Sequence, residues 1–180
     1  LRRPLPALSG VAPERASRRF AFAVAAALAF CAVQLAMPMR HLAYGGNVLW
    51  DEQGMRFSWR VMVREKNGSI TYVVRHKQTG RIWHVSPRAY LTRVQERELS
   101  GQPDLILQLA HHIHDDFARR GLGDTEVRVD ALVSLNGRGI APLIDPHVDL
   151  ASVEDGIGAA TWILPLPDSE PPKIRPIPRR

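Results

Sequence analysis

Three polar side chains alternate with apolar ones in a short segment that also holds a tryptophan. Arg56, Ser58 and Arg60 are spaced two residues apart, and Trp59 lies between the last two. In an extended strand this spacing places the three polar side chains on one face and Trp59 on the other. Two guanidinium groups roughly 13 Å apart on a strand can hold a carboxylate between them. The alternation equally fits an ordinary strand with a polar outer face and a core tryptophan.

A histidine cluster raises the possibility of metal binding. His111, His112 and His114 are followed directly by Asp115 and Asp116. On the helix that we predict here, only residues four apart, such as His111 and Asp115, share a face. No cysteine or further histidine pair completes a zinc site. We therefore expect a solvated helix face and no metal.

The segment from Asp145 to Asp149 combines two carboxylates with His147, a set suited to acid–base chemistry. It also fits a turn in which Asp145 precedes a proline and Asp149 caps a short helical turn. Ser58 lies in no Gly-x-Ser-x-Gly elbow, and the sequence contains no glycine-rich phosphate loop. The residue patterns of this chain therefore predict no catalytic residue.

The elements that must position these residues indicate an α+β domain. Period-two alternation predicts an antiparallel sheet, with Asn67-Gly68 and Asn136-Gly137 as hairpin turns. The predicted strands cover residues 55–63, 69–75, 81–85 and 127–135, with a return strand at 141–144.

Two helices are predicted between the third and fourth strands. Thr92 and Gln95 form a possible capping box for a short helix over 92–99. Residues 104–120 form the main helix, which ends at Gly121. Its apolar stripe should pack on the sheet, and it consists of Ile106, Leu109, Ala110, Ile113 and Phe117.

An uncharged apolar run precedes this domain. Residues 20–39 contain no Asp, Glu, Lys or Arg, and about 20 such residues in a helix cross a bilayer. Five arginines precede the run, so the amino end should be cytoplasmic and the following domain extracytoplasmic. The run is long for a signal peptide, and it holds Cys31, the only cysteine. A soluble domain secreted after signal cleavage remains an alternative.

The basic character of the chain lies mainly in its ends. The formal net charge is +6, but residues 1–19 and 173–180 together carry +8, so the rest of the chain is close to neutral. No basic stripe or reading motif appears between them, which argues against a nucleic-acid partner. We predict a basic cytoplasmic segment at 1–19, a transmembrane helix at 20–39, an extracytoplasmic α+β domain at 40–164 and a disordered proline-rich tail at 165–180.

Several separated segments resemble, in order, the vitamin K-dependent gamma-glutamyl carboxylases, and above all bacterial members with a horizontally transferred transmembrane domain. The similarity covers roughly residues 42–164. It rests on Trp50, Gly54, Phe57-Ser58-Trp59, Met62, Thr79-Gly80, Val85-Ser86-Pro87, Tyr90-Leu91-Thr92, Gln102-Pro103-Asp104-Leu105-Ile106-Leu107, Ser134-Leu135-Asn136-Gly137-Arg138 and Ile144-Asp145-Pro146-His147-Val148-Asp149-Leu150.

The resemblance implies a multi-pass membrane enzyme that carboxylates glutamyl residues while it oxidises vitamin K hydroquinone. The family's catalytic lysine lies in earlier membrane helices, so this chain is expected to be an inactive carboxy-terminal part. The segment that matches residues 50–59 is associated with glutamyl-substrate binding in the family. We therefore take Trp50, Ser58, Trp59, Arg56 and Arg60 as candidate substrate-binding residues. The alternative is a membrane-anchored binding or assembly domain without catalysis.

Overall fold

The computed structural model describes residues 18–170, and the chain divides into two units at residues 37 and 38. Helix α1 (Arg18–Met39) makes up the described part of the first unit and continues into the 3-10 turn η1 (Arg40–Ala43). Residues 18–43 are long and apolar enough to cross a membrane, judged by length and composition. The predicted basic segment lies largely outside the described residues.

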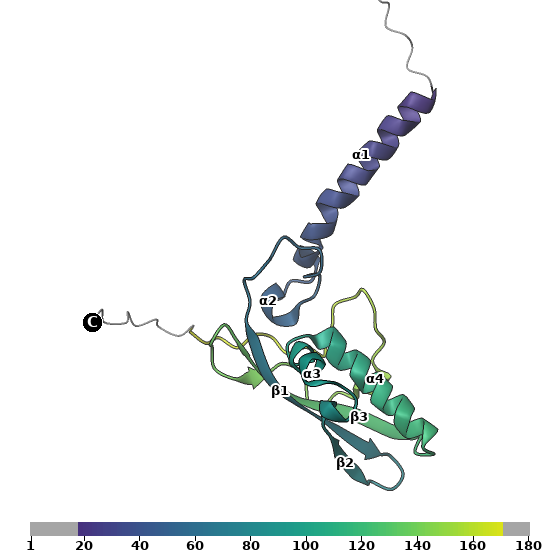
Figure 1. Cartoon of the computed structure of the whole chain (residues 1–180), viewed down its shortest axis with the longest axis vertical. Coiled ribbons are helices and arrows are strands. Elements are labelled where there is room, and N and C mark those ends of the chain that lie inside the picture. Colours follow the sequence, from purple (N-terminus) through teal and green to yellow (C-terminus); the bar gives the residue numbers. More distant parts are fainter. Residues whose placement is uncertain (1–17, 171–180) are drawn as a thin grey trace, which may run out of the picture. The chain divides into compact units, whose positions relative to one another are not determined.

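The second unit is built on a four-stranded antiparallel sheet in the order β2-β1-β3-β4 (Figure 1). The central pair joins β1 (Lys66–His76) and β3 (Thr125–Leu135), which pair along their whole length. The outer strands are β2 (Ile82–Val85) and β4 (Ala141–Pro142). Both outer strands are short, so each covers only part of its neighbour.

Two helices lie on one face of this sheet, and α4 runs along β3, just above it in the view of Figure 1. The helices are α3 (Arg93–Leu99) and α4 (Pro103–Arg119). The Tyr72 hydroxyl of β1 donates to the Ile106 carbonyl of α4 at 2.9 Å, and both residues are fully buried. The core fills the space between these layers. The fold class agrees with the sequence prediction of an α+β domain after one apolar helix.

Most of the predicted elements are confirmed. All five residues of the predicted stripe on α4 are buried, and the capping box of Thr92 and Gln95 closes the start of α3. Asn136 and Gly137 have φ angles of 50° and 73°, as a tight turn between β3 and β4 requires. The main helix begins one residue early, at Pro103, a residue suited to a first helical position.

One predicted strand and one predicted turn are wrong. Residues 55–63 form no strand, and Phe57 and Met62 have φ angles of 65° and 55° that break an extended course. Asn67-Gly68 is no turn, because β1 runs straight through it in register with β3. Gly68 serves close packing instead, since an added Cβ would lie 2.9 Å from the Ser100 carbonyl oxygen.

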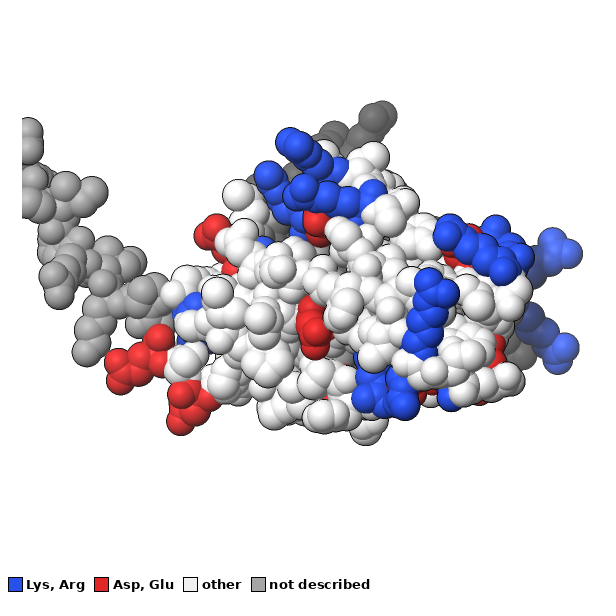
Figure 2. All heavy atoms as spheres, turned by 90° about the horizontal axis from the view of Figure 1, so that it is seen from below, with Lys and Arg blue, Asp and Glu red and all other residues white. Residues whose placement is uncertain are grey.

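Charges on the face seen from below in Figure 2 stand in separate groups. Lys and Arg side chains gather near its margins, and uncharged residues cover much of the surface between them. Arginines also occur in the irregular segment of residues 53–65 and in the segment that carries η2 (Pro87–Ala89) and α3.

Candidate functional site

Four of the five candidate substrate-binding residues lie on an irregular segment, the 53–65 loop, which connects α2 (Val48–Asp51) to β1, and the fifth, Trp50, lies in α2 itself. Apolar side chains on this loop face solvent: Trp59 is 75% exposed and Met62 is 97% exposed. Phe57 and Val61 are exposed as well. The prediction of a core tryptophan at position 59 is therefore wrong, and the loop carries an unusual density of exposed apolar groups.

Residues of η1 hold the loop. The Arg40 guanidinium lies 5.7 Å from the Phe57 ring centre, and Arg60 Nη2 lies 3.4 Å from His41 Nε2. His41 Nδ1 is 2.9 Å from the Pro38 carbonyl oxygen. Because a carbonyl only accepts and a guanidinium only donates, both contacts require a neutral His41 with its proton on Nδ1. The loop thus packs on the residues that directly follow α1.

The two candidate arginines of the loop differ in what neutralises them. Arg56 forms an ion pair with Asp104 at the start of α4. Arg60, by contrast, has the neutral His41 ring as its one polar contact among the described residues. The Ser58 hydroxyl donates to the Met55 carbonyl at 2.6 Å and so closes a local turn. Arg56, Ser58 and Arg60 do not share a strand face, and only Arg60 offers an unpaired guanidinium.

A buried lysine fixes the start of the loop. The Lys66 side chain is 3% exposed, and its Nζ donates to Glu52 Oε1 at 3.0 Å and to the Gly101 carbonyl at 2.7 Å. It also donates to the Trp50 carbonyl, and Glu52 pairs in addition with Arg64. Sequence reasoning missed Lys66, because its partners lie 14 to 35 residues away and no local pattern links them.

Trp50 belongs to the core and not to the exposed loop. It is 1% exposed, and its indole Nε1 donates to the Leu164 carbonyl at 2.8 Å. The neighbouring Asp51 is also buried, and desolvation raises the pKa of its carboxyl group. An added Cβ on Gly46 would lie 2.0 Å from Asp51 Oδ2, so a larger residue there would require the Asp51 side chain to move. Trp50 therefore positions the backbone from which the loop starts.

A cleft of about 350 Å³ opens between this backbone and the start of α4. Its charged lining includes the arginines at positions 40 and 56 and four carboxylates. Because the carboxylates outnumber the arginines, the cleft itself is unsuited to binding the carboxylate of a glutamyl side chain. The carboxylates are Asp51, Glu52, Asp104 and Asp155.

The three histidines of the cluster each contact a different group and do not converge on one point. His111 Nε2 lies 3.0 Å and 2.9 Å from the carbonyl oxygens of Leu150 and Val153, and His114 Nδ1 lies 3.1 Å from Thr125 Oγ1. His112 packs edge-on against the Tyr90 ring. Within residues 18–170, no group of three or more His, Cys, Asp or Glu side chains is placed to hold a metal ion.

The acidic motif at 145–149 has a structural role. Asp145 Oδ1 accepts from the His147 N–H at 2.9 Å, which closes a turn. Asp149 Oδ1 caps η3 (Leu150–Ser152) through the Ala151 N–H at 3.1 Å. The same oxygen accepts from the Val127 N–H of β3 at 2.8 Å. Asp145 therefore closes a turn and Asp149 caps a helical turn, as the turn interpretation predicts, and Asp149 in addition ties this motif to the sheet.

Residues 19–169 match the family model described as "Vitamin K-dependent gamma-carboxylase, lumenal domain". The chain belongs to this family. The match includes most of the apolar helix, the 53–65 loop and the whole sheet domain. No solved structure matches the chain.

Membership gives the fold a cellular setting. A lumenal domain that follows an apolar helix of spanning length indicates a membrane protein with an extracytoplasmic domain. The family name carries a link to vitamin K. The cleft beside the loop mixes its charged groups with apolar lining residues, among them Leu107, Trp162 and Ile163.

Proposed function

We propose that this chain is the carboxy-terminal, extracytoplasmic part of a gamma-carboxylase-like membrane protein, and that its 53–65 loop receives a glutamyl side chain. In this proposal the chemistry on vitamin K hydroquinone belongs to membrane helices outside the chain, and the chain alone is inactive. The supporting observation is the Arg60 guanidinium, which stands exposed beside Trp59 and contacts only a neutral imidazole among the described residues.

The parts of the loop would have different tasks. Arg60 would bind the carboxylate, because a guanidinium presents paired donors in a planar fork. Trp59 would cover the methylene groups of the glutamyl side chain with its exposed ring. Ser58 and Arg56 would keep the loop in shape through their bonds to Met55 and Asp104. Trp50 would act through packing alone.

Position supports the same assignment. The loop contacts Arg40 and His41, which directly follow the apolar helix in the chain. A glutamyl group held there would lie where the chain leaves the bilayer, if α1 spans it. Proton removal from a carbon atom needs a strong base, which survives best where water is scarce. The loop would therefore present its substrate next to a water-poor site.

The decisive experiment compares two short peptides on the intact membrane protein that contains this domain. Acetyl-Ala-Ala-Glu-Ala-Ala and its glutamine counterpart are titrated against the wild-type protein and Arg60→Gln in detergent micelles. We expect Arg60→Gln to weaken binding of the glutamyl peptide roughly 3- to 10-fold, the effect of one exposed charge pair or a little more. Binding of the glutamine peptide should stay the same.

Matched variants separate binding from folding. Arg119→Gln removes an exposed guanidinium from the end of α4 and should change neither affinity. Trp59→Ala should lower glutamyl-peptide affinity with little change in stability, because its ring is exposed. If Arg60→Gln and Trp59→Ala both bind the glutamyl peptide normally, the loop is not the substrate site, and the non-catalytic anchor becomes the better account.

A further inference from the structure

The strand β1 is left open along part of one edge. Its partner β3 covers the whole of one side, from Lys66 to His76. On the other side, β2 pairs only with residues 72–75. Within the described residues, no strand pairs with the β2-side edge of residues 66–71. About six residues of strand, roughly 20 Å, therefore have a free edge.

The free edge presents specific backbone groups. The His76 N–H donates to the Arg81 carbonyl at 2.9 Å, so the backbone groups of this even-numbered residue point toward the β2 side. Backbone groups alternate sides along a strand, which directs the N–H and C=O groups of Gly68 and Ile70 to the same side. No described residue hydrogen bonds to these four groups. They form a short template for an additional strand.

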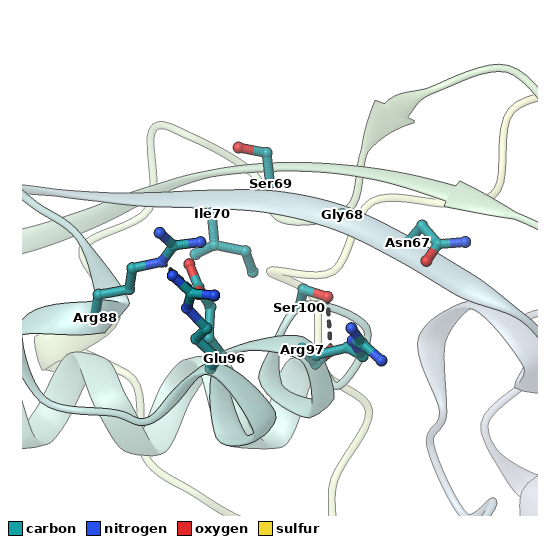
Figure 3. Close-up of a pocket in the computed structure, with 9 residues that line it drawn as sticks. Asn67, Gly68, Ser69, Ile70, Arg88, Glu96, Arg97 and Ser100 are labelled. Atoms are coloured by element: carbon teal, nitrogen blue, oxygen red, sulfur yellow. Dashed lines mark hydrogen bonds and ion pairs between the residues drawn. The ribbon is translucent and has the colours of Figure 1, made fainter.

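The chain after β2 explains why the edge stays open. Pro87 begins η2 and ends the pairing of this segment with β1, since proline has no N–H to donate to a ladder, while η2 itself remains in contact with β1. The chain then passes into α3, which lies beneath β1 in Figure 3. An open groove of about 650 Å³ remains between residues 67–70 of β1 and the α3 segment.

Three arginines line this groove, and only one of them is paired. Arg88 Nε contacts Glu96 Oε2 at 2.7 Å. Arg93 and Arg97 are exposed side chains of α3 that have no ion-pair partner among the described residues. Figure 3 shows Arg88 and Glu96 close together below β1, and Arg97 extending sideways from α3. The groove therefore has an excess of two positive charges beside unpaired backbone groups.

We propose that this groove binds an extended acidic peptide segment, which adds a strand to β1 in line with β2. Backbone hydrogen bonds to Gly68 and Ile70 would give affinity, as in other cases of strand addition. Acidic side chains on alternate positions would meet Arg93 and Arg97. The proposal does not depend on the function of the 53–65 loop, because no loop residue lines the groove.

Backbone methylation of the peptide tests the strand geometry directly. A fluorescein-labelled peptide of four Glu-Val repeats is titrated against the full chain in detergent micelles, followed by fluorescence anisotropy. Two further peptides carry N-methyl groups either on every Glu or on every Val. Only alternate N–H groups of an added strand face its neighbour. We expect one methylated peptide to bind at least about 10-fold more weakly and the other to bind like the parent.

Charge variants test the arginines. Arg93→Gln combined with Arg97→Gln should weaken binding of the parent peptide roughly 3- to 10-fold. Raising the salt concentration should reduce the difference in affinity between the wild type and this variant. Arg119→Gln with Arg120→Gln removes the same charge from the end of α4 and should have no effect. The same comparison is repeated in the Arg60→Gln background, so that binding of glutamyl side chains at the 53–65 loop is separated from binding in the groove; the loss caused by the Arg93/Arg97 substitutions should persist there.

Either of two results would overturn the proposal. Equal binding of both N-methylated peptides would exclude strand addition. Equal binding to wild type and to the Arg93/Arg97 variant would exclude the charge contribution, and the arginines would then serve only to keep the free edge from pairing with other copies of the chain.

Discussion

Lys66 shows how a single buried charge organises the residues around it. Burial of the side chain, with the nearby Arg64 charge as a smaller cause, lowers the pKa of Lys66 to about 7. The protonated amine nevertheless has Glu52 and the carbonyl oxygens of Trp50 and Gly101 as partners. One group therefore ties together α2, the end of α3 and the first residue of β1.

The lowered pKa predicts a pH dependence of stability. An unfolded lysine titrates near 10.5, so between pH 7 and pH 10 the unfolded chain binds more protons at this site than the folded chain. The free energy of unfolding should therefore rise with pH across this window, by up to about 1 kcal/mol per pH unit. Above it, Tyr72 acts in the opposite direction, because burial raises the pKa of its hydroxyl.

Urea denaturation of the full chain in micelles at pH 7, 8 and 9, followed by tryptophan fluorescence, measures this slope. Lys66→Met should remove the slope attributable to Lys66. Lys77→Met, which replaces an exposed lysine on the turn after β1, is the control and should keep it. A wild-type stability that falls over this range would contradict the prediction.

At the scale of elements, α3 depends on its first turn. Thr92 accepts from the Gln95 N–H, and the Gln95 side chain accepts from the Thr92 N–H at 3.0 Å. A helix of seven residues has little stability of its own, so this reciprocal cap matters. The helix also forms one wall of the groove beside β1.

Thr92→Ala should lower the free energy of unfolding by about 1 kcal/mol, the usual effect of losing a helix cap. Chemical denaturation measures the loss. Thr161→Ala serves as the control, since Thr161 is exposed in a turn and caps no helix. Equal stability of the two variants would show that the cap contributes nothing.

At the scale of the whole molecule, the apolar helix bears on whether the domain is held at a membrane and on which side it lies. Residues 18–43 have the length and composition of a membrane span, and the family match places a lumenal domain after it. We expect the full chain to stay in the membrane pellet after alkaline extraction. Externally added protease should cut residues 40–170 in spheroplasts and leave an amino-terminal tag intact. Release of the chain in soluble form would favour the cleaved-signal alternative.

Ala27→Arg combined with Leu28→Arg is the matched variant for this experiment. Each central arginine disfavours membrane insertion by about 2.5–3.5 kcal/mol on translocon scales. The variant should therefore appear in the soluble fraction or be degraded. Arg18→Gln, at the end of the helix, should leave membrane retention unchanged.

The amino-acid sequence by itself determined the elements whose signals are local. Alternation over residues 127–135, the stripe on α4, the caps at Thr92 and Asp149 and the turn at Asn136 all follow from neighbouring residues. The ordered motifs also indicated the family.

Only the tertiary structure decided the course of residues 53–68, because their conformation depends on distant partners. β1 extends through Gly68 since β3 pairs with it over eleven residues, and the backbone there must pass close to Ser100. Phe57 and Met62 take positive φ angles that break an extended course, so residues 55–63 form an exposed loop despite their alternation. Lys66, the pairing of Arg56 and the burial of Trp50 arise from the same long-range packing, which periodicity does not encode.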